Sequence, residues 1–185
     1  ITEEDTDFRY NGLPCTRGNM AKIATRAFEY LKEEDIADTS TYATKLKDYS
    51  DIPDKFKKYV LQAYGKGIIS GYEDGTFKPN NSITREEASM LLYKTAQYMG
   101  YNDFYEDYKL SDYKYADDEE IGEWAKEAVY QMNKAEIMIG MGDDMFSPKS
   151  NYTNEQSIST IMRLYDLQNK PKSTPTPTLA PTPEP

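Results

Sequence analysis

Two arginines occupy positions where an arginine can do chemistry. Arg17 and Arg85 each follow a threonine, and an apolar pattern at helical spacing begins directly after each Thr-Arg pair. A cation in the first turn of a helix opposes the helix dipole and contributes nothing to capping. Together with the free N–H groups of a helix start, it forms a site for a carboxylate or a phosphate. We therefore predict that Arg17 and Arg85 bind an anionic ligand, with a local salt bridge as the alternative.

The threonines beside these arginines have a structural explanation. Thr84 and Glu87 have the spacing of a capping box, in which each side chain accepts a hydrogen bond from the backbone N–H of the other residue. Thr153 and Gln156 repeat the device, and Asn154 stands where the arginines stand. The pattern predicts three helix starts, of which the third has lost its cation.

These helix starts belong to a repeat with a nearly constant period. Residues 67–79 (GIISGYEDGTFKP) and residues 136–148 (EIMIGMGDDMFSP) align without gaps at an offset of 69 residues. The units of a repeat protein cannot bury their apolar faces alone, so neighbouring units must pack together. Helical periodicity also precedes both loops, at about residues 55–64 and 122–134. Each complete unit is therefore expected to be a helix, a long loop and a second helix.

Aromatic and charged residues near the loops are further candidates for ligand contact. Gly71 and Tyr72 can line a sugar groove, because tyrosine offers an apolar face with a hydroxyl group. Trp124 is the single tryptophan, and its residue type leaves core packing and sugar stacking both open. The aligned position in the middle unit is Lys55, which can serve an anion as a point charge.

The composition excludes several classes of function. The net charge of −10 argues against nucleic acid and anionic membrane surfaces as partners. One cysteine and no histidine exclude a histidine-based triad, a Cys–His pair and a structural zinc site. No apolar run approaches the roughly 20 residues of a membrane span, and the loops lack the ligand series of a calcium-binding EF-hand. No pair of carboxylates stands out as a glycosidase pair, so we expect no catalysis, no cofactor and no metal.

At these motifs the chain resembles the S-layer homology (SLH) family. The family pattern has a Phe/Tyr-Ser-Asp-Val opening, a Trp-Ala helix, a Gly-Ile-Ile-x-Gly-Tyr loop and an Ile-Thr-Arg-x-Glu helix start. The middle unit matches it with Tyr49-Ser-Asp-Ile-Pro53, residues 67–79 and Ile83-Thr-Arg-Glu-Glu87. The last unit matches it with Tyr115-Ala-Asp117, Trp124-Ala125 and residues 140–148. The first unit retains only its loop end and its second helix.

The resemblance implies an all-α, pseudo-threefold module of helix–loop–helix repeats around a central three-helix bundle. That bundle consists of the helices that follow the three threonines. The expected division is a partial repeat at 1–34, a connector at 35–48, a complete repeat at 49–99, a connector at 100–114, a degenerate repeat at 115–168 and a Pro/Thr-rich linker at 169–185. Six of the ten prolines fall within residues 171–185, which is typical of an extended spacer toward a further domain.

The resemblance also implies a function. SLH modules bind secondary cell-wall polymers, typically with pyruvylated N-acetylmannosamine units, and tether exported proteins to Gram-positive-type envelopes. We therefore expect an extracellular, non-catalytic anchoring module that binds an anionic, pyruvylated cell-wall polysaccharide and does not insert into membranes. The residues implied in the grooves between repeats are Arg17, Arg85, Asp51, Asp117, Trp124, Gly71 and Tyr72, with Lys55 added for its charge. The alternative is a degenerate SLH domain that serves structural or protein–protein assembly without binding sugar.

Overall fold

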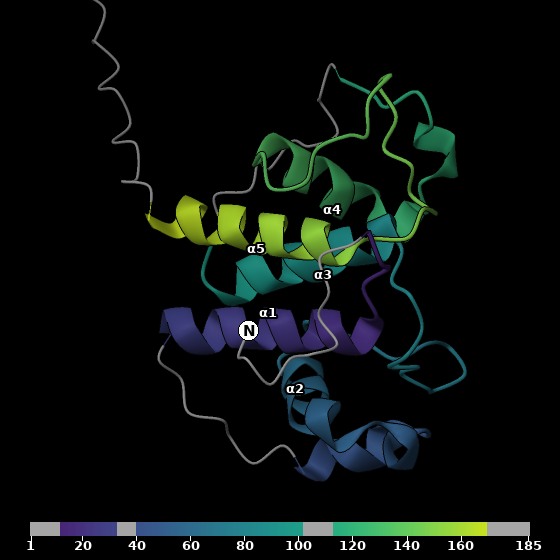
Figure 1. The fold of residues 1–185 in the computed structure, drawn as a ribbon, viewed down its shortest axis with the longest axis vertical. Helices are drawn as coiled ribbons and strands as arrows, with labels where there is room; N and C mark the ends of the chain where they lie inside the picture. The colour runs from purple at the N-terminus through teal and green to yellow at the C-terminus, as the bar shows by residue number, and fades with distance from the viewer. Residues whose placement is uncertain (1–11, 33–39, 102–112, 170–185) are drawn as a thin grey trace, which may run out of the picture.

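The computed structural model describes residues 12–32, 40–101 and 113–169, and these residues form helices and loops without a β-strand (Figure 1). The α-helices are α1 (Arg17–Lys32), α2 (Asp54–Gly65), α3 (Arg85–Tyr98), α4 (Glu123–Lys134) and α5 (Asn154–Asn169). Short 3-10 helices are η1 (Ser40–Lys45), η2 (Tyr49–Asp51) and η4 (Asp118–Glu120). The predicted all-α class and all the predicted helices are confirmed.

A closed ring of backbone hydrogen bonds joins the three units. The N–H of Cys15 donates to the carbonyl of Tyr152 at 2.6 Å, and the N–H of Tyr152 donates to the carbonyl of Ile83 at 2.9 Å. The ring closes where the N–H of Ile83 donates to the carbonyl of Cys15 at 2.9 Å. Each of these residues precedes a capping threonine, so every unit presents the same backbone groups to the next. The ring confirms the predicted pseudo-threefold arrangement.

The three helices that start from this ring form the central bundle. α1 packs against both α3 and α5, and Figure 1 shows the three helices running side by side across the middle of the view. Phe28, Leu92 and Leu164 are almost fully buried, one from each helix. Complete burial of side chains of this size stabilises the fold by about 1.5–3 kcal/mol each.

The other two helices pack on the outside of this bundle, α2 against α1 and α4 against α3. Phe56 of α2 lies so close to Gly18 of α1 that a Cβ atom added at Gly18 would be 2.8 Å from the phenyl ring. Ala125 and Ala128 of α4 are fully buried, so small side chains bring α4 close to its partner. The first helix of each complete unit therefore packs on the second helix of the preceding unit, so neighbouring units pack together as the repeat pattern predicts.

The threonines cap their helices as predicted. Thr84 Oγ1 accepts from the N–H of Glu87 at 3.3 Å, and Glu87 Oε2 accepts from the N–H of Thr84 at 2.9 Å. Thr153 and Gln156 form the same pair of bonds, at 3.3 and 3.0 Å. Thr16 Oγ1 accepts one N–H of its own helix at 3.2 Å. Loss of such a cap costs about 1 kcal/mol.

Some of the predicted segments fall outside the described residues. Most of the connector at 100–114 and nearly all of the linker at 169–185 belong to this group. In the connector at 35–48, the described part contains η1. Among the described residues, no helix has the length and apolar character that crossing a membrane requires.

Candidate functional site

An aspartate holds each of the two long loops in place. Asp117 is buried, and its carboxylate accepts from the N–H groups of Phe146 and Ser147 at 2.8 and 2.6 Å. Asp48 accepts from the N–H groups of Phe77 and Lys78, both at 2.8 Å. Bonds of this charge-assisted kind are about twice as strong as neutral ones. These aspartates therefore fix the path of the loop backbone.

The counterpart of Asp117 in the middle unit is Asp48 and not Asp51. Asp51 is exposed on η2, where its carboxylate accepts from the Ser50 hydroxyl. The constant offset of 69 residues relates Asp48 to Asp117 and would have identified it. The prediction instead followed the Tyr-Ser-Asp letters of the family pattern, which occur three residues later.

Arg85 is a buried link between α3 and the loop of the following unit. Its Nε donates to the carbonyl of Phe146 at 2.8 Å, and its Nη2 donates to the carbonyl of Ile139 at 2.8 Å. The guanidinium carbon lies 4.9 Å from the centroid of the Phe146 ring. Only 2% of Arg85 is exposed, and this burial lowers its pKa from the ordinary value. Arginine nevertheless stays protonated in proteins, so a positive charge is enclosed here.

The N–H groups at the start of α3 are occupied by protein acceptors. The N–H of Arg85 donates to the carbonyl of Ser150 at 3.0 Å, and the N–H of Glu86 donates to the carbonyl of Pro148 at 3.1 Å. The N–H of Glu87 bonds the capping threonine. α1 repeats this arrangement in its own first turn. The assumption that these helix starts offer free N–H groups to an anion was wrong, because neighbouring loops supply the acceptors.

Arg17 makes the corresponding loop contacts and one more. Its Nε donates to the carbonyl of Phe77 at 2.9 Å and its Nη2 to the carbonyl of Ser70 at 3.2 Å. Its Nη1 forms an ion pair with Glu87 Oε1 at 3.2 Å, and its guanidinium carbon lies 4.3 Å from the Tyr72 ring centroid. A guanidinium has five N–H donors, so these three bonds within the described residues leave two.

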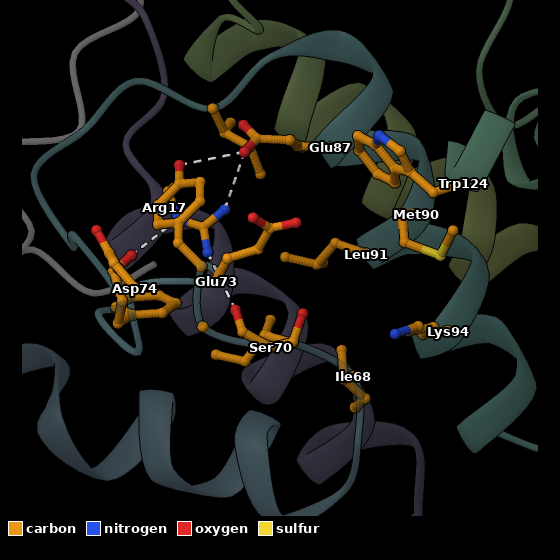
Figure 2. Close-up of a pocket in the computed structure, with 15 residues that line it drawn as sticks. Arg17, Ile68, Ser70, Glu73, Asp74, Glu87, Met90, Leu91, Lys94 and Trp124 are labelled. Atoms are coloured by element: carbon orange, nitrogen blue, oxygen red, sulfur yellow. Dashed lines mark hydrogen bonds and ion pairs between the residues drawn. The ribbon is translucent and has the colours of Figure 1, made fainter. Parts of the chain in front are cut away.

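A cavity of about 690 Å³ opens beside Arg17 (Figure 2). Its walls are the loop from Ile68 to Phe77, one face of α3 and the side chain of Trp124 from α4. The cavity brings together four of the predicted residues: Arg17, Gly71, Tyr72 and Trp124. The other four are not among its lining residues: Arg85, Asp51, Asp117 and Lys55.

Trp124 belongs to the cavity and not to the core, since 54% of it is exposed. Its indole lies over Gly122, where an added Cβ would come within 2.5 Å of the indole nitrogen. In Figure 2 the side chain stands at the opposite end of the cavity from Arg17. Lys55, at the aligned position in α2, lies with its ammonium 5.1 Å from the Phe56 ring.

Glu87 connects the polar groups of the cavity. Its Oε1 accepts from Arg17 and from the hydroxyl of Tyr72, both at 3.2 Å. Burial raises the pKa of Tyr72, so its hydroxyl stays protonated and able to donate. Met90 and Lys94 lie on the same face of α3, three and seven residues after Glu87. The sequence prediction missed this face because capping already explained Glu87.

Comparisons with known proteins assign the repeats to a family. The family model described as the S-layer homology domain matches residues 45–89 and 114–153. The chain is 33% identical over 111 residues to an endoglucanase of Bacillus sp. (strain KSM-635), covering 58% of this chain and 11% of that protein.

Two relatives come from Acetivibrio thermocellus. Cell surface glycoprotein 1 is 29% identical over 147 residues, which cover 75% of this chain and 6% of that protein. The cellulosome-anchoring protein is 30% identical over 108 residues, which cover 57% of this chain and 22% of that protein. The chain thus spans a small part of the length of these relatives. Residues 45–89 and 114–153 are therefore S-layer homology repeats.

Proposed function

We propose that this chain is a non-catalytic anchoring module that binds an anionic, pyruvylated cell-wall polysaccharide and tethers an exported protein to the bacterial envelope. The relatives support a role at the cell surface, because one is named as a cell surface glycoprotein and another as a cellulosome-anchoring protein. In this proposal the chain acts outside the cell, and the prolines at its C-terminal end separate it from a further domain.

The observation that carries the proposal is the meeting of Arg17, Tyr72 and Trp124 in one cavity. A pyruvyl ketal adds a carboxylate to a sugar, and a guanidinium is the side chain that best matches a carboxylate. Tyr72 and Trp124 supply apolar faces with a polar group at the edge, which suit the two-sided character of a sugar ring. The ligand carboxylate would accept hydrogen bonds from the two N–H groups of Arg17 that bond neither the loop carbonyls nor Glu87.

Glu87 has two effects on such a ligand. It holds the guanidinium of Arg17 in a fixed orientation, because it pairs with Nη1 while the loop carbonyls hold Nε and Nη2. It also supplies a carboxylate oxygen that can accept a hydrogen bond from a sugar hydroxyl. The ion pair is largely shielded, with 11% and 18% of the two side chains exposed, so solvent screens it less than a surface pair.

Hydrolysis of the sugar is a poor fit to this cavity. A glycosidase needs one carboxylic acid that stays protonated beside one carboxylate that is ionised. Asp74 is held ionised, because hydrogen bonds from Lys78 and Thr76 lower its pKa. Glu87 is engaged by Arg17 and by the N–H of Thr84. The enzyme names of some relatives describe proteins of which this chain covers a small fraction.

Purified cell walls test the proposed function. The chain should sediment with intact walls and should stay in the supernatant when the wall polymer has been extracted. Arg17→Ala should reduce sedimentation, whereas Lys55→Ala should not. Equal binding to intact and extracted walls would contradict the proposal, and it would favour assembly with a protein component of the wall.

A further inference from the structure

A cluster of four cations lies where α2 packs on α1, on the side of α1 that faces away from α5 (Figure 1). This basic cluster consists of Lys22 and Arg26 on α1 and Lys55 and Lys58 on α2, each pair about one helical turn apart. Lys22 is half-buried and the other three are exposed. The chain has a net charge of −10, so the basic cluster is opposite in sign to the molecule as a whole.

One tyrosine holds three of these cations on the same surface. The Nζ atoms of Lys22 and Lys58 lie 5.6 and 4.8 Å from the centroid of the Tyr59 ring. Arg26 Nη1 donates to the Tyr59 hydroxyl at 3.4 Å. Tyr59 is 8% exposed, so its ring is packed into the helix pair and can fix the positions of the side chains around it. The cations are therefore arranged together before any partner arrives.

The fold does not require these charges. α3 and α4 form the equivalent helix pair, and residues 68 or 69 positions later occupy the places of the four cations: Met90, Lys94, Trp124 and Glu127. Those four carry no net charge, and a buried alanine, Ala128, stands in the place of Tyr59. α3 and α4 nevertheless pack together as α1 and α2 do. The basic cluster has been added to a helix pair that forms without it.

The basic cluster also has an electrostatic cost. Like charges one turn apart on a helix repel each other, and both helices carry such a pair. The carboxylate at the start of α2, Asp54, pairs at 2.7 Å with Lys57, which is not a member of the cluster. An anion with several charges would turn this repulsion into attraction, which makes the basic cluster suited to a polyanion.

The chemistry of the basic cluster differs from that of the cavity beside Arg17, and none of its four members lines that cavity. Three of the four are lysines, whose ammonium groups bind phosphate as point charges without the fork that matches a planar carboxylate. The lysines occupy the surroundings of the buried Tyr59 ring, so no open aromatic face is offered on which a sugar or a nucleobase could stack. These features favour a partner recognised by its phosphates alone.

We propose that the basic cluster binds a phosphodiester polymer of the poly(glycerol phosphate) kind, at a site separate from the cavity beside Arg17. Successive phosphates would contact the lysines of α2 and the cations of α1. The site does not depend on the proposed binding of a pyruvylated polysaccharide, because the two use different residues.

Calorimetric titration of poly(glycerol phosphate) into the chain at several NaCl concentrations tests the proposal. The affinity should fall by about tenfold or more between about 50 and 200 mM NaCl, because phosphate contacts release counterions. The triple variant Lys22→Gln, Lys55→Gln, Lys58→Gln should bind about tenfold more weakly or worse. The slope of log affinity against log salt should also decrease by up to about one for each lysine removed. Glutamine is a good helix former, so melting curves should show that this variant stays folded.

A charge-matched control separates the basic cluster from net charge. Lys47→Gln, Lys114→Gln, Lys134→Gln removes the same three charges elsewhere and should bind like the wild type. Arg17→Ala should also bind poly(glycerol phosphate) normally, and the cluster variant should keep its affinity for a pyruvylated fragment. Lys55→Ala alone leaves three of the four cations, so its effect should be too small for wall sedimentation to detect.

Several outcomes would overturn the proposal. Absence of binding at about 50 mM NaCl would do so, and equal losses in the cluster variant and its control would show that only net charge matters. Polyglutamate of equal charge should bind several-fold more weakly, and equal affinity would show that phosphate is not selected. Binding to phosphatidylglycerol vesicles without binding to the soluble polymer would assign the surface to a membrane. Tighter binding of single-stranded DNA of equal charge would assign it to nucleic acid.

Discussion

The surroundings of Arg17 and Arg85 share a backbone frame and differ in their chemistry. Both arginines donate Nε to a phenylalanine carbonyl and Nη2 to a carbonyl earlier in the same loop, with the phenylalanines Phe77 and Phe146 at equivalent positions. In each loop, an aspartate carboxylate accepts hydrogen bonds from the N–H groups of that phenylalanine and of the residue after it. The two units therefore hold their loops by the same device.

The side chains that face outward have diverged. Beside Arg17 stand Glu87 and Tyr72, whereas the equivalent positions beside Arg85 hold Gln156 and Met141, whose Nε2 and Sδ atoms lie 3.5 Å apart. α4 closes the first site, and no described helix closes the second. The comparison teaches that the motif arginine is first a loop anchor. It becomes available to a ligand only where the surrounding residues leave part of the guanidinium exposed to a cavity.

The largest expected effect is on stability, at Arg85. Arg85→Ala would leave two loop carbonyls without a charged donor and create a cavity under Phe146. We expect a loss of about 3 kcal/mol in the free energy of unfolding, since hydrogen bonds to charged groups contribute about 1.5–3 kcal/mol each and their effects overlap. Urea denaturation measures it. A loss below about 1 kcal/mol would show that Arg85 does not anchor the loop.

Trp124 and Lys55 provide a matched pair for ligand binding, because they occupy aligned positions on α4 and α2. Trp124→Ala should weaken polysaccharide binding up to about tenfold, the range of an aromatic contact of about 0.5–1.5 kcal/mol. Stability should change little because Trp124 is exposed. Lys55→Ala should leave affinity unchanged. Calorimetry with soluble wall polymer measures both affinities. A loss of binding with Lys55→Ala would show that the ligand lies beside α2 and not in the cavity beside Arg17.

A smaller effect on stability is expected from a difference in backbone conformation between the two loops. Gly67 and Glu136 are equivalent residues with φ of 69° and 57°, a conformation that glycine adopts without cost and glutamate does not. Gly67→Glu should destabilise the protein by about 1 kcal/mol, and Glu136→Gly should stabilise it by up to about 1 kcal/mol. An added Cβ at Gly67 meets no atom within 4 Å, so the effect is conformational. Thermal denaturation of both variants measures it, and shifts of the same sign would refute the equivalence.

Local signals in the sequence were sufficient for most of the fold. The capping residues and the helical periodicity lie close together in the chain, so each helix could be predicted from its own residues, and the repeat period predicted the bundle. The roles of the arginines depend on carbonyls that lie more than 50 residues away, such as Phe77 for Arg17 and Phe146 for Arg85. Residue type and position at a helix start contain no information about those acceptors.

The candidate site was also only partly predictable, because it depends on contacts between residues that are far apart in the sequence. Tyr72 and Gly71 were predicted from their own loop, but their meeting with Arg17 and Trp124 joins three units of the repeat. Lys94 was missed because it has no motif of its own and reaches the cavity only through the face of α3 that it shares with Glu87.

The most direct test of the account is a titration of a soluble pyruvylated wall-polymer fragment into the wild-type chain, Arg17→Ala and Arg85→Ala. We expect one binding site in the wild type. Arg17→Ala should lose about tenfold to a hundredfold in affinity, as befits a charge-assisted pair of about 1.5–3 kcal/mol. Folded Arg85→Ala should retain wild-type affinity despite its lower stability. A folded Arg85→Ala that fails to bind while Arg17→Ala binds normally would contradict the account, because the ligand would then lie at the anchor of the last loop.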